Sequence, residues 1–210
     1  MNTITVSPTR LQRQQQIARH KTARRGHKLL KDKQDEMVRR LNELSRDRDE
    51  LRDTVNQEIA RAMGHFVSAK VRMSPTEIDN AVAAYRTEFA LITNTHNIMG
   101  LIVPKLETTA PATESNVTLQ TTPQNFDRAV ATLHAVMPKL VELAGTYKTC
   151  AMLEHQIATL RRRINALEHM VIPQIQHNIH YITLKLSENE RGNLVRMMKV
   201  KEIIADRDGD

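Results

Sequence analysis

The sequence predicts a mostly α-helical protein whose N- and C-terminal segments form one long antiparallel two-helix coiled coil with a small knob between them. In both segments apolar residues recur at steps of three and four, which places them on one narrow seam of a helix. Aromatic residues make up only 3% of the chain and tryptophan is absent, whereas a thick multilayered core usually needs more of them. The predicted seam consists of Leu41, Leu44, Leu51, Val55, Ile59, Ile157, Leu160, Ile164, Leu167, Val171, Ile175, Ile179 and Ile182.

The first long helix is expected within residues 1–67. Ser7 and Pro8 form a start signal, because serine is a good N-cap and proline fits the first helical position. No further proline occurs before about Phe66. A helix of about sixty residues spans about 90 Å, whereas a compact domain of this length has a radius of gyration of about 17 Å. We therefore expect a rod.

The knob is expected within residues 68–135. The run from Ser74 to Glu77 is a capping box with proline in the first turn, so a short helix should extend to about Thr87. A β-hairpin over about 89–103 is predicted from two β-prone runs around an asparagine-rich turn at 94–97, although such short apolar runs also fit a helix. A threonine-rich loop at 107–122 and a second short helix complete this segment.

The second long helix is expected within residues 136–210, ending near Lys201. Pro138 should bend or break the chain at its start, since proline removes one backbone hydrogen bond and clashes with the preceding turn. Pro173 lies inside the helix, where the apolar spacing slips between Val171 and Ile179. A kink and a local change of supercoil are expected there.

Charge is distributed unevenly along the chain. Residues 1–31 hold eight lysines and arginines and no acidic residue, whereas the other 23 basic and 24 acidic residues nearly cancel. Cations near a helix N-terminus oppose the helix dipole, so this segment should meet an acidic partner, unless it is simply a solvated face. A long basic helix beside a coiled coil is also the layout of a major-groove reader, so a coiled-coil scaffold or nucleic-acid binder is the alternative function.

Sequence motifs give little support for catalysis. The single cysteine, Cys150, lies on the apolar seam and is expected to be a buried thiol rather than a nucleophile. The chain has no Gly-x-Gly phosphate loop and no paired-cysteine metal motif. His177 and His180 share a helix face, but no third ligand lies near them. We therefore expect no catalytic residue, cofactor or metal, and no apolar run long enough to span a membrane.

Motifs near both ends and in the middle of the chain are similar to those of one known family. Residues 24–35 (RRGHKLLKDKQD), preceded by SPTR at 7–10, resemble the first helix of that family. Residues 162–168 (RRINALE) with Ile172 and Pro173 resemble its C-terminal signature, and KVK at 199–201 its tail. The middle is similar through IMG at 98–100 and VPKL at 103–106. The chain therefore resembles the D subunits of V-type and A-type rotary ATPases. The resemblance spans nearly the whole chain, with the motifs in the family's order.

The resemblance implies a non-catalytic rotor shaft on the cytoplasmic side of the membrane. Its helix pair would enter the catalytic hexamer of A and B subunits, its other end would dock on the funnel-shaped C/d protein above the membrane ring, and the small F subunit would bind beside the hairpin. No nucleotide or nucleic acid would bind the chain itself. The expected hexamer contacts are Arg10, Arg13, Arg24, Arg25, Lys28 and Lys31, and those facing the F subunit are Ile92, Ile98, Leu101 and Val103.

Overall fold

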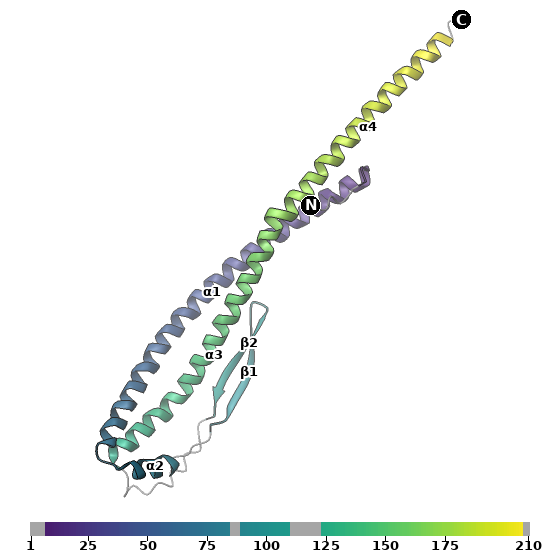
Figure 1. Ribbon diagram of the computed structural model, residues 1–210. Coiled ribbons are helices and arrows are strands. Elements are labelled where there is room, and N and C mark those ends of the chain that lie inside the picture. Colours follow the sequence, from purple (N-terminus) through teal and green to yellow (C-terminus); the bar gives the residue numbers. More distant parts are fainter. Residues whose placement is uncertain (1–6, 85–88, 110–122, 208–210) are drawn as a thin grey trace. The chain divides into compact units, whose positions relative to one another are not determined.

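The computed structural model describes residues 7–84, 89–109 and 123–207, and these are mostly helical (Figure 1). The chain divides into two compact units. The terminal unit contains Met1–Asp35 and Ala158–Asp210, and the central unit contains Glu36–Ile157. Each unit is described by itself below.

Helix α1 runs without interruption over Arg10–Lys70, a length of 61 residues. Its N-cap is Thr9, whose side-chain oxygen accepts a hydrogen bond from the Gln12 amide at 3.2 Å and whose carbonyl accepts one from the Arg13 amide at 3.0 Å. Ser7, the predicted cap, uses its carbonyl instead, which accepts a hydrogen bond from the Thr9 amide. The helix therefore starts two residues later than predicted, because Thr9 places its hydroxyl three residues before a free amide.

Helix α2 covers Pro75–Ala84 and begins at the predicted capping box. The Ser74 amide donates to Glu77 Oε2 at 2.8 Å, and the Glu77 amide donates to Ser74 Oγ at 3.4 Å. This reciprocal pair satisfies two amides that the first helical turn leaves free. The expected end of this helix near residue 87 lies outside the described residues.

The central unit contains the predicted β-hairpin, but its turn lies elsewhere. Strand β1 covers Leu91–Ile98 and pairs antiparallel with β2, Leu101–Thr108. The turn is Met99-Gly100, with φ angles of 55° and 87°, and the Gly100 amide donates to Asn97 Oδ1 at 2.8 Å. The predicted turn at 94–97 is therefore wrong, because those residues are in β1. Most of the predicted threonine-rich loop, residues 110–122, lies outside the described part.

Helix α3 covers Gln124–Ala166 and passes through Pro138 without a break. Residues 124–135, expected as a separate short helix, are thus the first turns of this long helix. Val136 is fully buried in a cluster with Val55 and Leu143, and Leu140 packs against the same cluster. Apolar packing on both sides of Pro138 holds the helix together despite the missing backbone hydrogen bond.

A π-helical segment, η1, covers Leu167–Val171 and leads directly into α4, Ile172–Arg207. The Ile172 amide donates to the Leu167 carbonyl, which is the five-residue step of a π turn. The irregularity expected at Pro173 therefore takes the form of a widened turn just before it. Val171, expected on the seam, is 40% exposed, while Ile172 beside it is half-buried.

Within each unit α1 packs antiparallel to the C-terminal helices, as predicted. In the terminal unit Arg10 contacts Glu190, and His27 contacts Glu168. In the central unit Glu58 contacts Lys139, so a later position on α1 again meets an earlier position on the returning helix. A second apolar cluster of this unit joins α1, α2 and α3 through Ala69, Ala81 and Phe126.

Candidate interaction surfaces

The first surface is the basic stretch of α1 in the terminal unit. All six predicted contact residues have exposed side chains, namely Arg10, Arg13, Arg24, Arg25, Lys28 and Lys31. Contacts with α4 and η1 are made largely by other residues, since His20 lies 3.3 Å from Gln176 and His27 lies 3.3 Å from Glu168. Of the six cations, Arg10 alone forms an ion pair in the described part of the chain, at 2.8 Å from Glu190. The other five are exposed and form no ion pair within the described part of the chain.

The predicted seam lies mostly inside the helix pair. Four of its residues are buried, namely Val55, Leu160, Ile164 and Ile182, and all the others except Val171 are half-buried. Sequence reasoning missed the contribution of alanines, because Ala62 and Ala69 are fully buried and continue from Val55 at steps of seven. The seven-residue spacing places both alanines on the same seam as Val55, so it could have identified them as buried.

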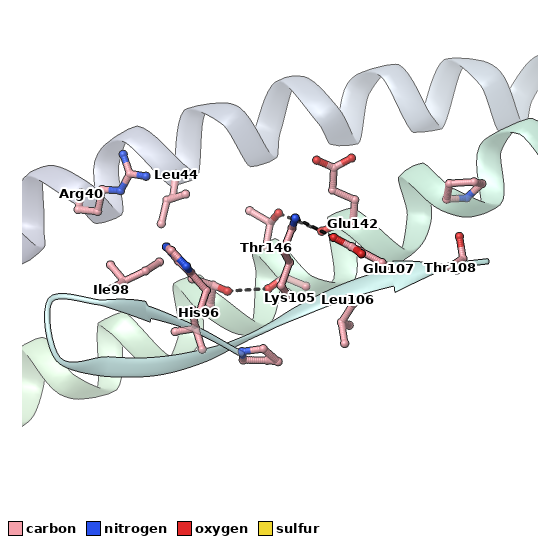
Figure 2. A pocket seen from close by; sticks show the side chains of 15 residues that line it. Arg40, Leu44, His96, Ile98, Lys105, Leu106, Glu107, Thr108, Glu142 and Thr146 are labelled. Carbon is pink, nitrogen blue, oxygen red and sulfur yellow. Dashed lines mark hydrogen bonds and ion pairs between the residues drawn. The ribbon is translucent and has the colours of Figure 1, made fainter. Parts of the chain in front are cut away.

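Strand β2 of the hairpin packs on α3, and Figure 2 shows its residues Lys105, Leu106 and Glu107 near that helix. A side chain placed at Gly145 of α3 would lie 3.6 Å from Leu106, which marks a close approach. Of the predicted hairpin contacts, Val103 is buried, Ile98 and Leu101 are half-buried, and Ile92 remains 47% exposed. The coiled coil itself therefore covers part of the apolar surface of the hairpin.

A crevice of about 630 Å³ lies between the hairpin, α1 and α3 within the central unit. Its charged residues are largely neutralised by neighbours, since Lys105 lies 2.7 Å from Glu107 and Arg40 donates to Glu43 at 2.8 Å. The hydrogen bond from Lys105 to Glu107, together with the negative charges of Glu107 and Glu142, raises the pKa of Lys105. Both cations therefore have a carboxylate partner within their own element, β2 for Lys105 and α1 for Arg40.

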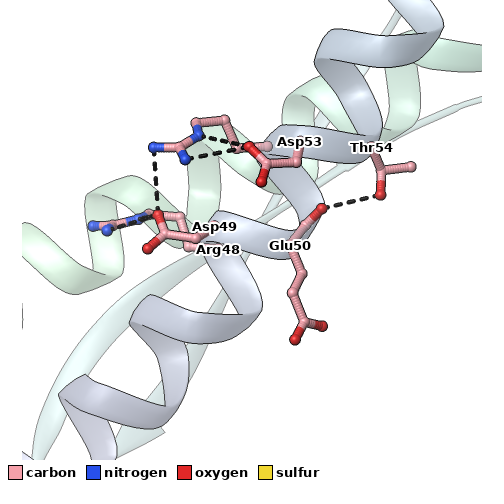
Figure 3. Close-up of polar contacts among 6 residues, drawn as sticks. Arg48, Asp49, Glu50, Asp53 and Thr54 are labelled. Atoms are coloured by element: carbon pink, nitrogen blue, oxygen red, sulfur yellow. Dashed lines mark hydrogen bonds and ion pairs between the residues drawn. The ribbon is translucent and has the colours of Figure 1, made fainter.

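Figure 3 shows a ladder of charges along α1 of the central unit. Arg48 and Arg52 alternate with Asp49 and Asp53, and these pairs lie 3.0 to 3.6 Å apart. The Arg48 guanidinium also lies 5.1 Å from the ring centre of Tyr147 on α3, a distance at which a cation–π contact is favourable. Hydrogen bonding to the neighbouring aspartates raises the pKa of both arginines.

Neither a nucleophile nor a metal site emerges from the geometry of the described residues. Cys150 is buried, and desolvation raises the pKa of its thiol, which disfavours the reactive thiolate. Among the described residues no group of three or more histidine, cysteine and acidic side chains could hold a metal ion. No described helix is long and apolar enough to cross a bilayer.

Comparison with known proteins agrees with this architecture along almost the full chain. Residues 12–202 match the family of ATP synthase D subunits. The V-type ATP synthase D subunit of Clostridium novyi is 39% identical over 209 residues, covering 97% of both chains. That of Acetivibrio thermocellus is 39% identical over 206 residues (96% of this chain, 93% of that one), and that of Enterococcus faecalis is 38% identical over 212 residues (97% and 98%). The chain therefore belongs to the family of ATP synthase D subunits.

Proposed function

We propose that this chain is the central-stalk rotor shaft of a V/A-type ATPase. It transmits torque between ATP hydrolysis or synthesis in the catalytic hexamer of A and B subunits and ion transport through the membrane ring. It contributes no catalytic group, and it acts as a peripheral component on the cytoplasmic side. Its other partners are the F subunit beside the hairpin and the funnel-shaped C/d protein above the ring. Family membership over nearly the whole chain supports this assignment.

The observation that carries the proposal is the exposed positive face of α1, formed by Arg13, Arg24, Arg25, Lys28 and Lys31. A rotating shaft needs attraction to its housing without locking at one angle. Coulomb forces vary smoothly with distance, whereas interdigitated side chains hold one position. An exposed cationic helix inside acidic rings meets this need, while the apolar seam supplies torsional stiffness.

Charge reversal tests the contact with the hexamer. Arg24, Arg25, Lys28 and Lys31 are replaced together by glutamate, and co-purification with the two large ATPase subunits and the ATPase rate are measured. We expect assembly to weaken, and the contact made by the unmodified chain to weaken in salt, because exposed charges are screened within about 8–10 Å at physiological ionic strength.

A matched control carries the same change of charge on the central unit. Four of its exposed arginines form no ion pair within the described part of the chain, and each is replaced by glutamate, namely Arg46, Arg61, Arg72 and Arg128. Assembly should persist in this control. Unchanged assembly of the first variant, or equal loss in both, contradicts the proposed contact. Retention on DNA with a steep salt dependence would instead favour the nucleic-acid alternative.

Removal of the hairpin tests its proposed contact with the F subunit. The strands span 91–108, so a short linker replaces these residues. Binding of the F subunit or the ATPase rate should fall, because the surface around Ile92 is removed. If both persist, the hairpin is only a cap on the coiled coil.

A further inference from the structure

The apolar seam of the returning helix contains one residue too many at η1. Before η1 the seam continues from Leu160 to Ile164 and Leu167 at steps of four and three, and after it the same steps begin again at Ile175. A heptad repeat continued from Leu167 would reach position 174, one residue short of Ile175. The helix of the terminal unit must therefore accommodate one extra residue between Leu167 and Ile175.

The π turn takes up this extra residue. The Ile172 amide donates to the Leu167 carbonyl, so the hydrogen-bonded turn holds one residue more than a turn of an α-helix. Ile172 is half-buried three residues before Ile175, whereas Val171 is 40% exposed. In a continuous α-helix Val171 would lie on the seam instead, since it is four residues after Leu167 and four before Ile175. Two adjacent apolar residues can thus fill the same place on the seam, and the width of the turn decides which one does.

A proline by itself does not produce a wide turn in this chain. Pro138 lies inside α3, which continues through it as an α-helix, and the buried residues around it, such as Val136 and Leu140, keep a regular step of four. Pro173 lies in the first turn of α4, directly after the π turn. Proline is tolerated in the first turn of an α-helix, but inside a helix it clashes with the preceding turn. Pro173 therefore favours the π turn, and the extra residue of the seam makes that turn compatible with packing.

We propose that residues 167–172 form a two-state twist joint in the returning helix. In the first state, seen here, the turn is π, Ile172 is covered and the left-handed supercoil continues in phase. In the second state the turn is α-helical, Val171 is covered and the supercoil unwinds locally, as it does at a stutter. The states differ by one residue, so the seam beyond the joint turns by about 100° relative to the seam before it. None of the five residues of η1 is buried, so little packing opposes the change.

In the rotor shaft proposed above, this joint absorbs twist. That role rests on the proposed function, because it needs a shaft under torque. Torque that unwinds the coiled coil favours the α-helical turn, and torque that winds it favours the π turn. Helix α1 contacts the returning helix on both sides, since His27 lies 3.3 Å from Glu168 at the start of the joint and His20 lies 3.3 Å from Gln176 beyond it. Twist is taken up between these two contacts.

Thiol labelling of the full chain tests the joint without load. Val171→Cys and Ile172→Cys are made separately, and the buried Cys150 serves as the thiol that stays unreactive while the chain is folded. With Pro173 in place, the thiol at 171 should react faster than the thiol at 172. Adding Pro173→Ala removes the preference for the π turn, so the ratio of the two rates should fall by about threefold or more. The matched control, Pro138→Ala, should leave the ratio unchanged. An unchanged ratio in Pro173→Ala, or an equal fall in both proline variants, overturns the proposal.

The same two thiols test the joint under load in the whole ATPase. Their labelling is compared with and without ATP hydrolysis, and the ratio of rates should fall by about threefold or more during hydrolysis. A ratio that stays constant during hydrolysis, although Pro173→Ala changes it in the free chain, overturns the role in absorbing twist and leaves the rotor assignment standing. Failure of the unmodified chain to join the ATPase contradicts the proposed function, whereas the result for the free chain does not depend on it.

Discussion

The two units share helices α1 and α3 but are stabilised differently. All buried apolar residues of the described chain lie in the central unit except Leu160, Ile164 and Ile182. The terminal unit exposes many large apolar side chains along α4, and its helices also meet through polar contacts such as His20–Gln176 and Arg10–Glu190. Burial of apolar area is the main source of folding free energy. We infer that the central unit holds most of the stability, while the terminal unit keeps surface available for partners.

The largest expected effect comes from paired truncations of leucine. Leu153 in the central unit is 0% exposed, and Leu184 in the terminal unit is 55% exposed. Leu153→Ala should lower the free energy of unfolding by about 2–5 kcal/mol, because it leaves a cavity. Leu184→Ala should change it by less than about 0.5 kcal/mol. Urea unfolding followed by circular dichroism measures both, and similar losses would remove the distinction between the units.

The N-caps of α1 and α2 offer a second comparison, with a smaller effect. Thr9 caps α1 in the terminal unit and Ser74 caps α2 in the central unit. Ser74→Ala should cost about 1 kcal/mol, as losses of N-caps typically do. In Thr9→Ala only the first turn of α1 should fray, because little apolar area is buried around it. The free energy of global unfolding and the amide exchange at residues 10–14 are measured for both variants. An equal loss of unfolding free energy in Thr9→Ala and Ser74→Ala would contradict the comparison.

The features predicted from sequence are those that local chemistry determines. The capping box at Ser74 works wherever the chain places it, and apolar steps of three and four define a seam regardless of what packs on it. The exposure of the cationic face of α1 could also be predicted, because lysines and arginines without acidic partners are rarely buried. The two long helices, the short helix of the knob and the charged face of α1 could therefore be predicted from the sequence.

The features missed are those that tertiary contacts determine. The asparagine-rich residues 94–97 have high turn propensity, yet the turn is Met99-Gly100, where Gly100 adopts a positive φ and Asn97 binds its amide. That register also lets Val103 be buried. Pro138 stays helical because neighbours on both sides are packed. Pro173 indicated an irregularity, but not that the turn before it would widen.

Two interhelical ion pairs test whether the units also differ in their polar contacts. Lys139 and Glu58 of the central unit have side chains 41% and 24% exposed, whereas Arg10 and Glu190 of the terminal unit are 80% and 59% exposed. Double-mutant cycles to alanine should give a coupling of up to about 1 kcal/mol for the first pair and about 0.2 kcal/mol for the second, because solvent screens exposed pairs. A larger coupling for the exposed pair would reverse the comparison.

The smallest expected effect is a pH dependence confined to the capping box of α2. The hydrogen bond from the Ser74 amide to the carboxylate lowers the pKa of Glu77 below its ordinary value of 4.5. Because the folded-state pKa is the lower one, this stabilisation is present above pH 4.5 and is lost as the pH falls through the pKa of the folded state. The N-cap of α1 has the neutral Gln12 at the equivalent position and should show no such change.

Glu77→Gln isolates this contribution, because glutamine keeps an acceptor for the Ser74 amide but cannot titrate. The difference in unfolding free energy between the unmodified chain and Glu77→Gln should shrink between about pH 6 and about pH 3, whereas Gln12→Ala should show a difference that does not vary with pH. Comparing variant with parent at each pH cancels the titration of the other carboxylates. A constant difference for Glu77→Gln would mean that the capping box stabilises α2 through hydrogen bonding alone, as the cap of α1 does.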